Sequence, residues 1–308
     1  MMNISLTTCF RGYKKVRTCG LFRHLYNENH RQAMVPAETK LIKQEVCIVI
    51  TRNSGNAPSA SCLHGTEGVL RLQEALMGGM GRSFNGSYAE YALLPTHHVF
   101  PVETALIWEE MAAISETYFT EWGSLFQCFR LTKEDKLLVR SVTCALGYVA
   151  IQLAKSLGCT VVGTTYRESK MELLKEAGCD ECILDDGNLR GKVSGVTKAL
   201  ELIGIKTVKD TMMCMEQGGI VCNTGVLGKV YDWNHFDSIK DIPNGVCLTG
   251  FYSNYPITKM MQDIFSFMDA HQLKPLIGAT YDFDNVREAC IALDEGKVNG
   301  KIVVKVGD

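Results

Sequence analysis

Residues 136–165 read KLLVRSVTCALGYVAIQLAKSLGCTVVGTT. This stretch opens on a short apolar, strand-like run at 136–141 and closes on a second one at 159–165. Between them, apolar residues recur with helical spacing over 146–157, and Gly158 follows, as glycine commonly does after a helix. The order predicts a strand, a helix and a second strand, which is one βαβ unit of a parallel sheet.

The same alternation continues toward the C-terminus. Further helices are predicted over 169–177 and 206–215, and further strands over 181–184, 198–203, 219–224 and 246–251. Strands that alternate with helices at this spacing form parallel sheets covered on both faces. We therefore predict an α/β fold with a doubly wound, Rossmann-type sheet over residues 116–270.

The loop between the first strand and the first helix is the place where such a sheet holds a dinucleotide. Free N–H groups and the partial positive charge of a helix start bind the pyrophosphate there. On the pattern G-x-G-x-x-G, the three glycine positions are Val142, Cys144 and Gly147, so only the third is glycine. The loop alone leaves two interpretations open: a dinucleotide site, or an ordinary connection without a ligand.

The end of the second strand favours NADP over NAD. An NAD site carries an acidic residue about 20 positions beyond the glycine loop, where it binds the ribose 2′-hydroxyl. Here the corresponding residues are Thr165, Tyr166 and Arg167, with Lys170 just beyond. A hydroxyl and two cations suit a 2′-phosphate, because arginine binds phosphate with paired hydrogen bonds. The alternative is a solvated helix start.

The chain before residue 116 is organised differently. An apolar run at 44–50 and the alternating GSYAEYALL at 86–94 predict strands of a compact antiparallel domain over 35–115. A glycine-rich loop at 77–86 lies between them. Near the other end, a helix over 284–294 and a strand over 301–306 are expected to complete that domain from residues 271–308.

Residues 1–34 form a basic N-terminal extension with six Lys or Arg and one acid, Glu28. Such a composition occurs in organellar transit peptides, but the segment has few serines and no clear amphipathic helix. We expect a poorly packed extension and a cytoplasmic protein; a mitochondrial targeting peptide is the alternative.

Composition excludes several classes of function. Lys plus Arg number 32 against 34 Asp plus Glu, a net charge of −2, so no overall positive field favours nucleic acid. The longest apolar stretch is interrupted at Arg140 and Gln152, which argues against a membrane span. Thirteen scattered cysteines, with no secretory leader before them, predict reduced and mostly buried thiols.

Five separate motifs together resemble a known family. They are MGGMGRSFNGSYAEYALLP at 77–95, ETYFTEWG at 116–123, the run 139–186 that overlaps the stretch quoted above, GGIVCNTG at 218–225 and GKIV at 300–303. The chain resembles the medium-chain dehydrogenase/reductase superfamily in its zinc-free quinone oxidoreductase and enoyl reductase branch. The resemblance covers about three quarters of the chain.

The resemblance implies a GroES-like, mainly β catalytic domain followed by a Rossmann domain, with the site in the cleft between them. It implies a homodimer that transfers hydride from NADPH to small molecules, either quinones or carbon–carbon double bonds conjugated with a carbonyl. The pyrophosphate would lie along Ser141, Val142, Thr143, Cys144, Ala145, Leu146 and Gly147. The 2′-phosphate would face Thr165, Arg167 and Lys170. The nicotinamide would lie beside Gly225, Val226, Leu227 and Phe251, with Thr120 opening a nearby helix.

The same comparison predicts that the protein holds no metal. Where related zinc enzymes have Gly-His-Glu, this chain has Gly65-Thr66-Glu67, and the four-cysteine structural site is missing. The only C-x-x-C, Cys179 with Cys182, precedes a predicted buried strand and is interpreted as structural. His97-His98 has no partner ligands at metal-like spacing.

Without zinc, the chain must position the acceptor and stabilise developing oxygen charge while the cofactor supplies the hydride. Tyr118 and Thr120 are the catalytic hydroxyl candidates, with Tyr88 a third. For each the alternative is ordinary packing.

The departures from the family keep other functions open. The first domain lacks several early strands and is shortened between Thr66 and Met77, and Ser141 stands where glycine is usual. An active NADPH-dependent quinone or enoyl reductase is the favoured function. A catalytically impaired NADPH-binding paralogue with a regulatory or binding role is the alternative. An interaction or RNA-binding role is supported only by the basic N-terminus.

Overall fold

The computed structural model describes residues 104–253 and 257–306, together with six strands of the preceding chain at 39–43, 47–50, 62–65, 72–75, 91–95 and 99–102. The N-terminal extension, the glycine-rich loop at 77–86, Tyr88 and His97-His98 are outside the described residues. Thr66 and Glu67 are also outside them, whereas Gly65 is the last residue of a described strand.

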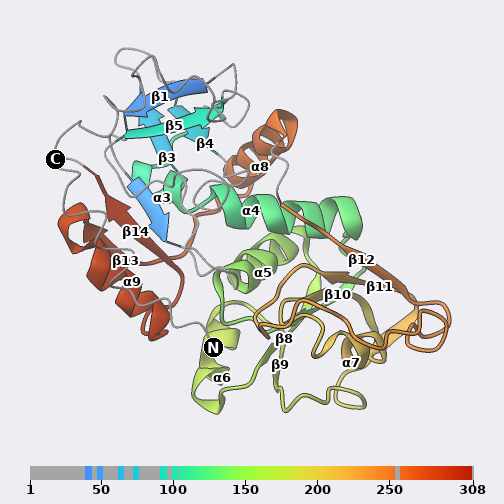
Figure 1. The fold of residues 1–308 in the computed structure, drawn as a ribbon. Coiled ribbons are helices and arrows are strands. Elements are labelled where there is room, and N and C mark those ends of the chain that lie inside the picture. Colours follow the sequence, from blue (N-terminus) through green and yellow to red (C-terminus); the bar gives the residue numbers. More distant parts are fainter. Residues whose placement is uncertain are drawn as a thin grey trace, which may run out of the picture.

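A six-stranded parallel sheet forms the centre of the larger part of the molecule (Figure 1). Its order is β12 (Cys247–Gly250), β11 (Met215–Asn223), β10 (Val196–Glu201), β7 (Lys136–Arg140), β8 (Thr160–Thr165) and β9 (Glu181–Leu184). Numbered along the chain, this is the order 6-5-4-1-2-3 of the doubly wound dinucleotide-binding fold. The predicted Rossmann-type α/β fold is confirmed.

The central strand β7 explains why the run KLLV decides the fold. Leu137 and Val139 are fully buried in one core cluster, whereas Leu138 is fully buried in another. Alternate side chains of a strand point to opposite faces, so both faces of β7 are covered. Two covered faces require the near-continuous apolar sequence that this strand has.

Short helices connect these strands. They are α5 (Ala145–Leu157), α6 (Met171–Glu176), which follows a 3-10 turn at Glu168–Lys170, and α7 (Val208–Met212). Helix α5 ends at Gly158, whose φ of 87° is the left-handed conformation that glycine adopts without strain. The helix predicted over 206–215 is shorter, because Met215 already pairs with Val196 as the first residue of β11.

The strand after the C-x-x-C pair is not the buried strand that the sequence suggested. β9 is the edge of the sheet; its two end residues, Glu181 and Leu184, are exposed, and the two residues between them are half-buried. Cys179 and Cys182 are both half-buried free thiols.

Further helices lie outside the connections between the parallel strands. They are α3 (Trp108–Ala112), α4 (Ser115–Trp122), a π-helical turn at Gly123–Cys128 and α8 (Thr258–Ala270). The rings of Trp122, Phe126 and Phe267 pack together with centroids 4.1–5.6 Å apart, which ties α4 and its π-helical continuation to α8. No helix in the described ranges is long and apolar enough to cross a membrane.

A second six-stranded sheet joins the two ends of the chain. Its order is β13 (Ile277–Asp282), β14 (Lys301–Lys305), β2 (Cys47–Ile50), β3 (Cys62–Gly65), β4 (Leu72–Ala75) and β6 (Val99–Val102). β14 pairs antiparallel with β2, and α9 (Val286–Asp294) packs beside them (Figure 1). A separate pair is formed by β1 (Thr39–Lys43) and β5 (Tyr91–Pro95).

A largely buried ion network, centred on the fully buried Arg140, ties together the C-terminal ends of three parallel strands. Arg140, the last residue of β7, donates two hydrogen bonds to the carboxylate of Asp185, at 2.8 and 3.0 Å. Its guanidinium also lies 2.8 Å from Asp210. Glu201 at the end of β10 accepts hydrogen bonds from Thr207 and Thr211 and faces the same charge.

The pKa directions within this network follow from its burial. Burial acts to lower the pKa of Arg140, but Asp185, Glu201 and Asp210 together raise it. Burial also tends to raise the pKa of Asp185, and the hydrogen bonds from Arg140 overcome this and lower it. The guanidinium is therefore permanently charged, and the network depends on it.

Candidate functional site

The candidate site lies where the direction of strand addition reverses. β7 is hydrogen-bonded to β8 on one side and to β10 on the other. Helix α5, which follows β7, and helix α7, which follows β10, cover opposite faces of the sheet, because their buried residues belong to two separate core clusters. In open α/β sheets a ligand binds at this reversal point, outside the carboxyl ends of the strands.

The loop from Ser141 to Gly147 occupies this point and is held tightly to its neighbours. Ser141 N–H donates to Thr164 Oγ1 at 3.0 Å, and Val142 N–H donates to Thr164 O at 2.9 Å. A Cβ on Gly147 would lie 2.3 Å from Val142 O, so only glycine allows α5 to start this close to the loop. This is the close-packing role expected of the third glycine in the motif.

Ser141 has a φ of 75°, in the left-handed region that glycine favours. A non-glycine residue held there costs about 1–2 kcal/mol. The structure thus places serine in a backbone conformation for which the glycine usual in this family is better suited.

We predict that Ser141→Gly raises the free energy of unfolding by about 1 kcal/mol, because the backbone strain is relieved. Urea denaturation of the cofactor-free protein measures the change. Ser156→Gly, inside α5, is the matched control and should lower stability, since glycine is unfavourable within helices. Equal destabilisation by both substitutions would contradict the strain at Ser141.

Cys144 replaces the second glycine, and its thiol caps helix α5. Its Sγ accepts the N–H of Gly147 at 3.4 Å and donates to Ser141 O at 3.5 Å. Burial raises the pKa of this thiol to about 11, so it is a neutral capping group and not a reactive thiolate. Thr143, Ala145 and Leu146 complete the loop and the start of the helix.

The end of β8 presents two cations without acidic partners. Thr165 is buried, and its Oγ1 accepts the N–H of Arg167 at 3.3 Å. Burial and the nearby charge of Arg167 lower the pKa of Lys170, which shows that the two cations face one region. Among the described residues neither forms a salt bridge; Arg167 contacts the ring of Tyr166, and Lys170 lies 3.5 Å from Asn299 Oδ1.

The segment after β11 packs closely against the residue that follows β10, Leu202. A Cβ on Gly225 would lie 2.1 Å from Leu202 O, and Leu227 N–H donates to the same oxygen at 3.0 Å. Val226 lies between them, and Leu227 is substantially exposed. The ring of Phe251 lies against Gly123 and has its centroid 5.9 Å from that of Phe119.

The two hydroxyl candidates have partners within the chain. The Tyr118 hydroxyl donates to Gln152 Oε1 on α5, and burial raises its pKa. Thr120 Oγ1 donates to Glu116 O at 2.7 Å. Thr120 does not open its helix as the sequence suggested: α4 begins five residues earlier, at Ser115. Their catalytic roles stay predictions.

Two residues of the site were not found from the sequence. Glu121, next to Thr120, is fully buried, and within the described part of the chain neither carboxylate oxygen has a hydrogen-bond partner. Glu121 lies close enough to Cys144 and Cys222 to influence the pKa of both thiols, which places it near the start of α5. Burial raises its pKa well above the usual value, which favours the protonated form of the carboxyl.

Lys301 is the second residue. It is 5% exposed at the start of β14, and its charge acts on Cys144 at the start of α5. Burial lowers its pKa to about 8. It lies within the GKIV motif, but no local pattern distinguishes a lysine that faces α5 from an ordinary strand residue.

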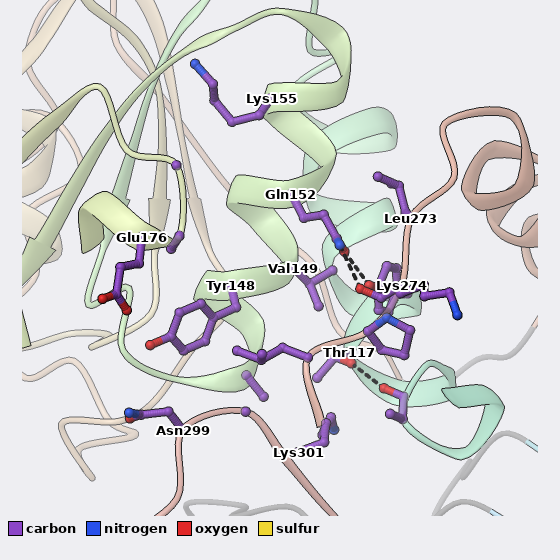
Figure 2. Close-up of a pocket in the computed structure, with 18 of the residues that line it drawn as sticks. Thr117, Tyr148, Val149, Gln152, Lys155, Glu176, Leu273, Lys274, Asn299 and Lys301 are labelled. Carbon is purple, nitrogen blue, oxygen red and sulfur yellow. Dashed lines mark hydrogen bonds between the residues drawn. The ribbon is translucent and has the colours of Figure 1, made fainter. Parts of the chain in front are cut away.

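A cavity of about 830 Å³ adjoins this region along the outer side of α5 (Figure 2). Ala145 and Lys301 line one end of it, and Lys155 and Ser156 line the other. Within the residues that the structure describes, no group of three or more His, Cys, Asp or Glu side chains is placed to hold a metal ion.

Comparisons with known proteins agree with this architecture. A family model described as zinc-binding dehydrogenase matches residues 145–270. A quinone oxidoreductase from Pongo abelii is 25% identical over 231 residues, which cover 72% of this chain and 70% of that protein. An alcohol dehydrogenase from Geobacillus stearothermophilus is 27% identical over 251 residues, which cover 80% and 70%.

Solved structures have the same fold. The quinone oxidoreductase from Thermus thermophilus, also solved with NADPH, has a TM-score of 0.66 at 20% identity, covering 88% of this chain and 92% of that one. A mycobacterial protein complexed with NADPH has a TM-score of 0.70 at 18% identity, covering 87% and 91%.

Fold and site together define an α/β protein with a dinucleotide-binding type of sheet. The family model and these relatives show that the chain is similar to proteins of the medium-chain dehydrogenase/reductase superfamily.

Proposed function

We propose that the protein is an NADPH-dependent oxidoreductase that transfers hydride, without zinc, to a quinone or an α,β-unsaturated carbonyl compound. The observation that carries the proposal is the pair Arg167 and Lys170 at the end of β8, without acidic partners among the described residues. Two adjacent cations with no counter-charge suit the doubly charged 2′-phosphate that distinguishes NADPH from NADH. Relatives named quinone oxidoreductase support the same class.

The residues present fit this cofactor. The N-terminus of the 13-residue helix α5 points its partial positive charge at the reversal point of the sheet, and the buried ammonium of Lys301 adds to it. A side chain at Gly147 or at Gly225 would clash with the neighbouring backbone, so glycine allows the chain to pack closely at both positions. When bound, NADPH supplies the hydride.

The chain's own residues have positioning roles in this proposal. Arg167 and Lys170 hold the phosphate of the adenosine half, and the loop 141–147 holds the pyrophosphate. The segment from Gly225 to Leu227, with Phe251, lies at the nicotinamide end and excludes water from it. Thr66 stands where related zinc enzymes have a histidine ligand, which supports hydride transfer without a metal.

The test is NADPH oxidation by the purified full chain with a quinone and, separately, an α,β-unsaturated ketone. We expect turnover with at least one acceptor, faster with NADPH than with NADH and unchanged after treatment with a zinc chelator. Intact folding without turnover on either acceptor would refute the enzymatic function. Loss of activity on chelation would refute zinc independence.

Arg167→Ala and Lys170→Ala are each expected to weaken NADPH binding about tenfold, because each removes a charge-assisted contact to the 2′-phosphate. NADH binding should change less than about twofold, since NADH lacks that phosphate. Calorimetric titration with both cofactors measures this. Lys175→Ala, an exposed lysine paired with Glu172 on α6, is the matched control and should leave both affinities unchanged.

A second function is favoured by the loop itself. Ser141 and Cys144 replace glycines, and the Cys144 thiol takes the N–H of Gly147 that would otherwise face a phosphate. A cofactor-binding paralogue without turnover is therefore the alternative. It predicts that NADPH raises the melting temperature while neither acceptor is reduced. Assembly as a homodimer, and a cytoplasmic or mitochondrial location, stay predictions.

A further inference from the structure

Two thiols meet over one glycine at the edge of the parallel sheet. Cys182, the second residue of β9, pairs directly with Gly163 of β8. Cys179 lies in the turn between α6 and β9, and its Sγ is 2.3 Å from the position that a Cβ on Gly163 would occupy. Because glycine has no side chain, the space above Gly163 is filled by the Cys179 sulfur.

The register of the strands fixes the direction of the Cys182 side chain. Paired residues of neighbouring parallel strands point to the same face of a sheet, so Cys182 points to the face on which Cys179 covers Gly163. The core clusters agree: Cys179 and Cys182 pack against the cluster that contains α5, whereas Ile183 packs against the cluster on the opposite face. The two thiols are therefore neighbours on one face of the sheet.

The surroundings of the two sulfurs differ. On one side the pair is closed, because Val142 Cγ2 lies 2.9 Å from the same Cβ position above Gly163. On the other side β9 is the edge of the six-stranded sheet, and Cys182 is half-buried. A small molecule from solvent therefore reaches the pair at Cys182.

Protonation gives the two sulfurs different roles. Burial raises the pKa of Cys179 to about 12, and the neighbouring Cys182 is the next cause. Burial also raises the pKa of Cys182, whereas the charge of Lys175 and a hydrogen bond from Cys179 act to lower it. Cys182 is therefore the attacking thiol, and Cys179 is its protonated partner. Thiols with raised pKa values exchange slowly, but the position of the equilibrium does not depend on the rate.

We propose that Cys179 and Cys182 are a redox modification site, at which exchange with a low-molecular-weight disulfide forms a reversible bond within the chain. With glutathione disulfide, the Cys182 thiolate attacks one sulfur, forms a mixed disulfide and releases one glutathione. The Cys179 thiol then loses its proton, attacks the Cys182 sulfur and releases the second glutathione. The protein loses two electrons and two protons, and the two glutathione molecules carry them away.

The test is equilibration of the full chain in glutathione buffers of increasing oxidised fraction, followed by alkylation of the remaining thiols and digestion with trypsin. Cleavage after Lys175 and Arg190 releases EAGCDECILDDGNLR, which contains both cysteines and no other. We expect mass spectrometry to show this peptide without alkyl groups and lighter by two hydrogen atoms than the dithiol. The oxidised fraction should saturate, and a reductant should restore the dithiol.

The melting temperature is a second readout. A bond that fits the native geometry restrains only the unfolded chain, and for so short a loop the oxidised protein should melt about 3 °C higher than the reduced protein. The two states are compared after the same equilibration.

Variants separate the pair from general oxidation. Cys179→Ser and Cys182→Ser should each abolish the internal bond and the rise in melting temperature, and the half-buried Cys182 is the substitution that disturbs the fold less. Cys247→Ser is the matched control, because it removes an exposed thiol on β12, the opposite edge of the sheet. It should leave the oxidised fraction of the peptide and the rise in melting temperature unchanged.

Three results would overturn the proposal. One is that both thiols stay open to alkylation in buffers that already attach glutathione to Cys247. Another is a peptide that carries glutathione without forming the internal bond. The third is a melting temperature that does not rise on oxidation, which would show that the bond does not fit the folded chain. None of these results depends on NADPH or on an acceptor, so the proposed function is tested independently.

Discussion

Replacing Arg140 with methionine is expected to lower the free energy of unfolding by about 3–5 kcal/mol, because the substitution leaves charged partners buried without compensation. Asp185 and Glu201 would lose the guanidinium that neutralises them, and Asp210 would lose a contact of 2.8 Å. The side chain of Arg140 has no exposed surface, so water cannot take over its role. Urea denaturation followed by circular dichroism measures the change.

Lys136→Met provides the matched control on the same strand. Lys136 pairs with Glu181 at 2.6 Å, but both side chains are partly exposed. Exposed pairs contribute about 0–1 kcal/mol, so this variant should unfold close to the wild-type denaturant concentration. The double variant Arg140→Met with Asp185→Asn should lose less than the sum of the two single changes. Similar small losses at Arg140 and Lys136 would show that the buried network does not stabilise the fold.

Replacing Glu121 with glutamine is expected to change how stability depends on pH. The pKa of Glu121 is raised by burial in the folded protein, whereas the unfolded chain titrates near the ordinary value of about 4.3. Above that value the unfolded state releases a proton that the folded state retains. Wild-type stability therefore falls as pH rises, by about 1.4 kcal/mol per pH unit, until the pH passes the folded-state pKa.

Glutamine has no proton to release, so Glu121→Gln should remove this part of the slope. We expect the variant to become progressively more stable than wild type as the pH rises from the unfolded-state value of about 4.3 toward the raised folded-state pKa, as measured by urea denaturation at several pH values. Glu134→Gln changes a carboxylate that is 71% exposed and should leave the profile parallel to wild type. Parallel profiles for Glu121→Gln as well would mean that its carboxyl is not held neutral by burial.

The fold was predictable where the sequence pattern is local. The run 136–165 has a strand period, a helix period and a terminal glycine within thirty residues, and β7, α5 and β8 follow them to within one residue. The edge strand β9 was placed correctly but expected to be buried, since a short apolar run such as Cys-Ile-Leu does not reveal whether a strand has one neighbour or two. α8 was missed, although its buried residues Met260, Ile264 and Met268 repeat at helical spacing.

The site was less predictable because its chemistry depends on contacts between distant segments. Cys144 and Ser141 could be recognised as departures from a glycine pattern, but the cap and the positive φ are properties of the folded loop. The raised pKa of Glu121 depends on what packs around α4. Lys301 faces a helix that begins more than 150 residues earlier, and only tertiary structure brings the two together.

The antiparallel pairing of β14 with β2 has a consequence for the order in which the chain folds. During synthesis the Rossmann strands leave the ribosome as a consecutive block and can assemble from local contacts. β2 is made early but has to wait for β14, which emerges last, before that edge of its sheet is paired. The long stretch of chain between β2 and β14 raises the entropic cost of pairing these two strands. Until β14 is made, that edge of β2 stays open. Ribosome-bound chains should therefore contain a folded nucleotide-binding sheet before β14 completes the second sheet.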